Sequence, residues 1–74
     1  MRRIEPGKKY KHFKGKDYEV LAIATHSETS EKYVVYKALY GSEGIYVRPY
    51  KMFASEVDKK KYPDASQRYR FEEV

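Results

Sequence analysis

The chain alternates short runs of β-branched and aromatic residues with segments rich in glycine, proline and polar residues. Runs bounded by such turn formers are typical of strands, and here they cover residues 8–13, 18–25, 33–40, 45–48 and 68–72. Gly41 and Gly44 predict a tight hairpin between the third and fourth runs. Residues 50–57 instead space their apolar side chains as a short helix would. We therefore expect a mostly β fold, a small antiparallel SH3-like barrel of about five strands with one short helical element.

A chain of 74 residues has room for a single hydrophobic core, so we expect one domain over residues 1–74. Pro6 and Gly7 precede the first strand run and form a turn signal, which makes residues 1–7 a candidate flexible leader. Residues 58–67 are charged and interrupted by Pro63, so we expect a loop there.

The chain contains no cysteine, which excludes a disulfide framework, a thiolate zinc site and a cysteine nucleophile. No apolar run approaches the roughly 20 residues that span a bilayer. The first residues also lack the apolar stretch of a secretory signal. We therefore expect a cytoplasmic protein that does not interact with membranes.

The residues that catalysis requires are missing. Ser27 beside His26 does not make a nucleophile and base pair, because adjacent strand residues point to opposite faces. The segment GSEG at 41–44 lacks the lysine and following helix of a phosphate-binding loop. We predict no catalytic residue and no cofactor, and expect that the protein is not an enzyme. A small enzyme acting on a nucleotide or modified base is the third of three functional hypotheses.

One group of residues has the ligand types of a metal site, namely His12, His26 and Glu28. Their spacing matches none of the paired histidine or cysteine motifs that hold zinc. Structural or solvated roles are favoured, with His26 and Glu28 capping a turn, so we predict no metal site.

The net charge of +5 is concentrated at the N-terminus, because residues 1–16 contain seven Lys or Arg and one Glu. Five lysines there are interleaved with Tyr10 and Phe13, and such a pattern can bind phosphates and stack bases. These are Lys8, Lys9, Lys11, Lys14 and Lys16. The favoured alternative is ordinary surface lysine that protects an edge strand from aggregation. An RNA- or DNA-binding accessory domain is therefore the second hypothesis.

The nine tyrosines suggest an aromatic binding surface around the hairpin. In residues 45–48 the alternation separates Ile45 and Val47 from Tyr46 and Arg48, and we expect the aliphatic pair to face the core. Tyr36 and Tyr40 would then lie beside Tyr46 in an exposed groove that ends at Arg48, suited to an anionic or planar ligand.

The leading hypothesis is a non-enzymatic binding module for a peptide, a nucleotide or a partner protein. Its candidate ligand-binding residues are Tyr36, Tyr40, Tyr46, Arg48, His26 and Glu28. The alternative for Arg48 is a surface ion pair with Glu28 or Glu19. Met52 and Phe53 are expected to plug one end of the core, and the alternative is that they line a groove.

Seven segments in this order carry a family resemblance: YKHFKG at 10–15, YEVL at 18–21, ATHSET at 24–29, VVY at 34–36, LYG at 39–41, VRP at 47–49 and MF at 52–53. Together they resemble the bacterial domain-of-unknown-function 1653 family. The resemblance implies an SH3-like β fold in a cytosolic protein, with no accepted enzymatic activity or cofactor. Two features depart from the family pattern. Tyr46 stands where the family usually has Trp, and the tail from Lys59 to the last strand is longer.

Overall fold

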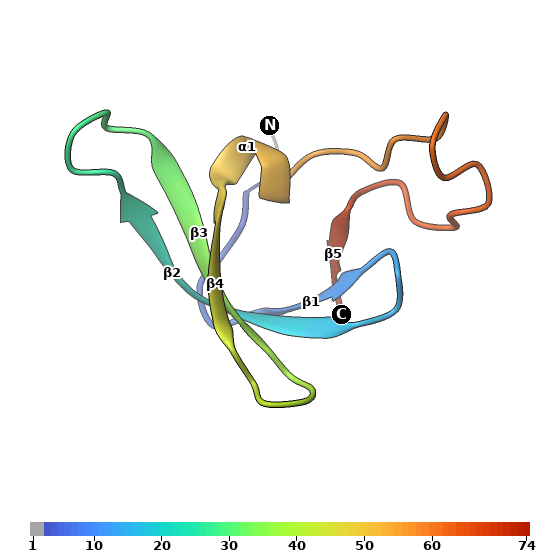
Figure 1. Cartoon of the computed structure of the whole chain (residues 1–74), viewed down its shortest axis with the longest axis horizontal. Coiled ribbons are helices and arrows are strands. Elements are labelled where there is room, and N and C mark those ends of the chain that lie inside the picture. The colour runs from blue at the N-terminus through green and yellow to red at the C-terminus, as the bar shows by residue number, and fades with distance from the viewer. Residues whose placement is uncertain (1–2) are drawn as a thin grey trace.

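The computed structural model describes residues 3–74, which form one five-stranded antiparallel sheet and one short helix (Figure 1). The elements in chain order are β1 (Lys9–His12), β2 (Asp17–Thr25), β3 (Lys32–Ala38), β4 (Ile45–Pro49), α1 (Tyr50–Phe53) and β5 (Phe71–Glu73). The strand order in the sheet is β4-β3-β2-β1-β5. The prediction of a mostly β fold with one short helix is confirmed. No helix in the described residues is long and apolar enough to cross a membrane.

The sheet is open between its two edge strands, β4 and β5. Within residues 3–74 no backbone ladder joins these strands, so closure into the predicted barrel is not observed. The rings of Phe53 in α1 and Phe71 in β5 fill this side instead, stacked with centroids 4.0 Å apart and planes 6° from parallel. Packing of aromatic side chains therefore takes the place of strand pairing there.

One face of the sheet carries the core, and we call it the core face. Buried Tyr10, Val20, Val34 and Tyr36 define it, and Phe53 and Phe71 complete the cluster. The alternation is clearest in β3, where every second residue from Val34 to Ala38 is buried. The register of β2 against β3 shifts between Val20 and Ala22, so Leu21 is a bulge and is 40% exposed. A bulge bends its strand, which curves the sheet around the core.

β1 lies inside the sheet, paired with β2 on one side and β5 on the other. The interpretation of its lysines as edge-strand protection is therefore wrong. Lys9 and Lys11 alternate with buried Tyr10 and lie on the opposite, outer face. There they are in register with Glu19 and Asp17 of β2, which places opposite charges across the ladder.

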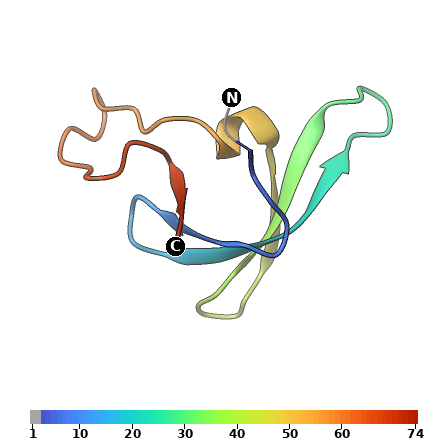
Figure 2. The same ribbon diagram turned by 180° about the vertical axis from the view of Figure 1, so that it is seen from behind.

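The described part of the expected leader, residues 3–7, packs against the sheet. Ile4 is 3% exposed and belongs to the core cluster. Its backbone N–H donates to the Tyr50 hydroxyl at 2.7 Å, and the N–H of Gly7 donates to the carbonyl of Val20 at 2.8 Å. Figure 2 shows this segment running from α1 down to the sheet. Residues 1–2 of the expected leader lie outside the described residues.

The helix is shorter than the predicted span of residues 50–57. It ends at Phe53, and the Ser55 hydroxyl then bonds the carbonyl of Met52 at 2.6 Å. Phe53 is fully buried as expected, whereas Met52 is 47% exposed and does not plug the core. The chain continues into the 54–70 connection, which includes buried Val57 and the charged loop at 58–67.

Candidate functional site

The faces of β4 are the reverse of the prediction. Tyr46 is in register with Tyr36, and Arg48 with Val34, so both lie on the core face. Ile45 and Val47 are 63% and 62% exposed on the outer face. The expectation that the aliphatic pair takes the core is wrong. Arg48 reaches β5 from this face, with its guanidinium carbon near the Phe71 ring, and Tyr46 lies beside Tyr36.

Arg48 is held at this edge by two aromatic residues. Its Nε donates a hydrogen bond of 3.1 Å to the Tyr36 hydroxyl, and its guanidinium carbon lies 5.5 Å from the ring centroid of Phe71. No carboxylate of the described residues lies within 4.0 Å of it, so the proposed ion pair with Glu28 or Glu19 is not formed. The remaining guanidinium donors are therefore available to a ligand.

Tyrosines continue along the core face from Arg48. The rings of Tyr36 and Tyr46 are 5.9 Å apart, but Tyr36 is 5% exposed and belongs to the core, so it does not line the exposed groove that the sequence predicted. Tyr40 joins them through Tyr18, since the two hydroxyls are 2.7 Å apart and Tyr18 meets Tyr36 edge to face. Burial, and then the hydrogen bond with Tyr40, raises the pKa of Tyr18 above its usual value. Tyr18 therefore keeps its proton at neutral pH.

A pocket of about 290 Å³ lies beyond Arg48, between β1, β4 and the 54–70 connection. Its lining carries four cationic side chains and one carboxylate, that of Asp58. The lining residues are His12, Phe13, Lys14, Arg48, Asp58, Lys61, Tyr62 and Arg70. Asp58 Oδ1 accepts bonds from the backbone N–H groups of Lys60 and Lys61. We call this cavity the two-arginine pocket.

Arg70 is fixed in this pocket by its backbone. Its N–H donates to the carbonyl of Ser55 at 2.9 Å, and its carbonyl accepts from the N–H of Phe13 at 3.0 Å. Its side-chain Nε is buried without a hydrogen-bond partner among the described residues. A buried donor without a partner costs free energy, and such groups are rare in native proteins. Arg70 therefore contributes an unpartnered buried donor beside the pocket that its side chain lines.

His12 stands beside the two arginines on the core face. Burial, followed by the positive charges of Arg48, Arg70 and Lys14, lowers its pKa from 6.5 to about 4. Its Nδ1 accepts a 3.1 Å bond from the N–H of Lys14, so the neutral ring carries its proton on Nε2. His12 is therefore an uncharged residue of the pocket lining at neutral pH.

The other predicted residues lie elsewhere. His26 and Glu28 belong to the turn after β2, at the opposite end of that strand from His12. His26 Nδ1 accepts the N–H groups of Glu28 and Thr29, at 3.2 and 3.3 Å, as a turn cap would. Among the described residues, no hydrogen bond or ion pair joins this pair to Arg48. Within residues 3–74 no three His, Asp or Glu side chains gather as a potential metal site.

The five candidate lysines are divided among four places. Lys9 and Lys11 are on the outer face, and Lys8 pairs with Glu73 at 3.7 Å. Lys16 Nζ lies 4.9 Å from the ring centroid of Tyr40. Lys14 is the one of these five lysines that lines the two-arginine pocket. The lysine stripe seen in the sequence is therefore not one surface.

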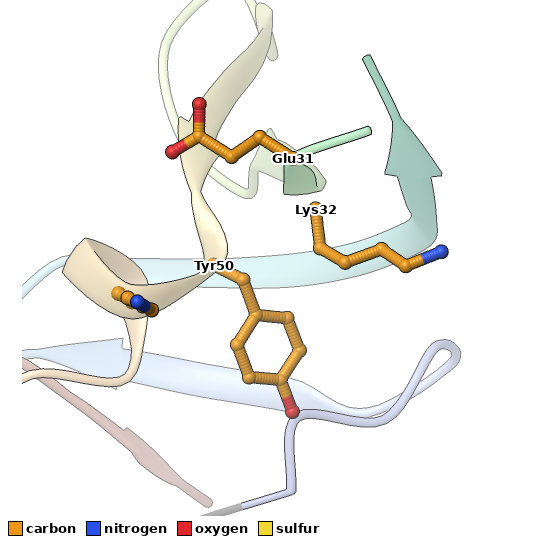
Figure 3. Close-up of a pocket in the computed structure, with 4 residues that line it drawn as sticks. Glu31, Lys32 and Tyr50 are labelled. Atoms are coloured by element: carbon orange, nitrogen blue, oxygen red, sulfur yellow. The ribbon is translucent and has the colours of Figure 1, made fainter. Parts of the chain in front are cut away.

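A second cavity of about 430 Å³ is lined by Glu31, Lys32, Tyr50 and Lys51. Figure 3 shows the carboxylate of Glu31 and the ammonium group of Lys32 pointing away from each other. The Tyr50 hydroxyl already accepts the N–H of Ile4. Although this cavity is larger, its polar groups do not converge on one point, so the two-arginine pocket is the better candidate.

Comparison with known proteins identifies the family but no activity. A family model described as a protein of unknown function (DUF1653) matches residues 8–73. The crystal structure of a protein belonging to DUF1653 from Bordetella bronchiseptica is 34% identical, with a TM-score of 0.79. That similarity covers 100% of this chain and 91% of the Bordetella chain. No curated protein matches. The family match extends through β5, well past the last motif noted in the sequence, and the chain therefore belongs to the DUF1653 family.

Proposed function

We propose that this protein is a non-enzymatic binding module whose two-arginine pocket takes an anionic group, a phosphate or carboxylate, from a ligand with a planar part. The orphaned Nε of Arg70 carries the proposal, because an acceptor there would satisfy a buried donor. In this view the curved sheet is an SH3-like scaffold that places the pocket between β1, β4 and the 54–70 connection.

The neighbouring groups support an anion. Arg48 and Arg70 provide guanidinium donors, whose planar fork suits carboxylate and phosphate oxygens. Arg48 is oriented by Tyr36 and Phe71 without a competing carboxylate. A planar part of the ligand would rest on the aromatic rings that flank the guanidinium groups. No serine, threonine or cysteine lines the pocket beside His12, so the lining lacks the hydroxyl–histidine or thiol–histidine pair of nucleophilic catalysis.

The test is calorimetric titration of the protein with inorganic phosphate and with adenosine monophosphate. We expect Arg70→Gln to weaken binding of both at least tenfold, since one hydrogen bond to a charged group contributes about 1.5–3 kcal/mol. Arg68→Gln is the matched control, because Arg68 lies two positions away, pairs with Glu56 at 3.6 Å and is largely exposed. Equal losses in the two variants, or no loss in Arg70→Gln, would contradict the proposal.

The alternative of nucleic-acid binding through the N-terminal lysines has less support. Those lysines do not share a face, and Lys8, Lys9 and Lys11 have acidic neighbours. A nucleic acid would have to use a different surface.

A further inference from the structure

The two-arginine pocket continues into an adjoining hollow of about 330 Å³, which is distinct from the larger cavity at Tyr50. The two cavities share Phe13, Lys14, Lys61 and Tyr62, and the second adds Pro63, Asp64 and Ala65. Building on the function proposed above, we propose that the two cavities form one groove that binds single-stranded nucleic acid. A phosphate would lie at Arg48 and Arg70, and a base on the Phe13–Tyr62 ring pair.

The ring pair combines stacking surface with positive charge. The centroids of Phe13 and Tyr62 are 4.9 Å apart, with the planes tilted by 60°. Lys14 Nζ lies 5.2 Å from the Tyr62 centroid and 5.9 Å from that of Phe13, and Lys61 Nζ lies 5.5 Å from Tyr62. Both rings are only partly buried, so each keeps accessible surface. Aromatic rings interleaved with cations are the pattern by which proteins hold single strands.

The ring pair is built from two distant segments that the fold holds together. Phe13 follows β1, and its N–H donates to the carbonyl of Arg70. Tyr62 belongs to a turn whose N–H groups bond back to Asp58, with Tyr62 itself donating to the Asp58 carbonyl at 2.8 Å. Figures 1 and 2 both show the 54–70 connection extending on the side of the β1–β2 turn. Arg70 thus links the phosphate position to the stacking position.

The mixture of groups favours a single-stranded nucleic acid over other polyanions. A peptide of acidic residues alone, such as polyglutamate, would use the four cations but has no aromatic group to stack on the rings. A duplex keeps its bases stacked inside and unavailable to Phe13 and Tyr62. The groove also contains the carboxylates of Asp58 and Asp64, so charge alone does not make it a strong polyanion site.

The experiment measures fluorescence anisotropy of a labelled eight-nucleotide oligouridylate with the full-length protein. Unlabelled adenosine monophosphate, double-stranded DNA and polyglutamate serve as competitors. We expect the oligonucleotide to bind at least tenfold more tightly than the mononucleotide, and its affinity to fall as salt rises. Tyr62→Leu should weaken it about 5- to 150-fold, the range found when one stacking ring is removed. Tyr33→Leu is the control, because Tyr33 lies beside His26 and Glu31, away from the groove.

Thermal melting of Tyr62→Leu checks that the variant folds, and Lys61→Gln probes the same site without removing a ring. The inference is overturned if oligouridylate binds no more tightly than the mononucleotide, if polyglutamate competes equally well, or if Tyr62→Leu and Lys61→Gln both leave binding unchanged. In each of these cases phosphate can still bind at Arg70, and the function proposed above stands. Loss of phosphate binding as well would remove both proposals.

Discussion

At the scale of single residues, Arg70 is the strongest sign of function in this protein. Evolution can keep an unsatisfied buried donor when binding requires it, and such sites commonly reduce stability. Arg70 also lies close enough to His12 for its charge to lower the histidine pKa. The sequence shows Arg70 only as one residue of an alternating strand, so neither its burial nor its missing partner was predictable.

Replacing Arg70 should therefore stabilise the fold. We expect Arg70→Met to raise the free energy of unfolding by about 1 kcal/mol, because it removes the orphaned donor and keeps the apolar stem. Urea denaturation of the wild type and of Arg70→Met measures the difference in the free energy of unfolding. Arg68→Met, on the exposed side, should change stability by less than about 0.5 kcal/mol. A loss of stability in Arg70→Met would show that its guanidinium is already satisfied in the free protein.

His12 should make stability depend on pH. Its folded-state pKa of about 4 lies below the ordinary 6.5, so the unfolded chain takes up the proton first as pH falls. Stability from this group is fully present above pH 6.5 and is lost progressively down to about pH 4. Urea denaturation across this window should show a steeper decline for the wild type than for His12→Asn. Parallel profiles would mean that His12 titrates normally in the folded state.

At the scale of elements, the strand runs and the hairpin glycines were predictable because they depend on local sequence. The orientation of β4 was not, because alternation separates two faces without saying which one is buried. Hydrophobicity favoured Ile45 and Val47, but the open edge places the longer Tyr46 and Arg48 over the core. The position of β1 inside the sheet depends on β5, a three-residue strand from the far end of the chain.

A pair of valine substitutions tests the two faces. Val34 in β3 is fully buried, and we expect Val34→Ala to lower the free energy of unfolding by roughly 2 kcal/mol. Val47→Ala, at a 62% exposed position in β4, should cost less than about 0.5 kcal/mol. Both values come from urea denaturation. Similar costs at the two positions would mean that the outer face of β4 is covered in solution.

At the scale of the whole molecule, the candidate site depends on long-range assembly. Of the predicted ligand residues, Tyr36, Tyr46 and Arg48 come together and Tyr40 joins through Tyr18, whereas His26 and Glu28 are bonded to each other in the turn after β2. Sequence reasoning missed Arg70, Lys61 and Tyr62. The available signal was a lysine next to an aromatic residue, repeated at 13–14 and 61–62, but only the folded chain shows that the repeats meet.

The central claim is that the two-arginine pocket binds an anion through Arg70. Side-chain Nε–H resonances of arginine, followed by ¹H–¹⁵N NMR during titration with inorganic phosphate, test this at the atom concerned. The account predicts that the Arg70 Nε–H signal shifts saturably and moves downfield as its hydrogen bond forms, that Arg48 responds with it, and that Arg68 does not. A titration in which Arg70 is unchanged while exposed arginines and lysines shift without saturation would contradict it.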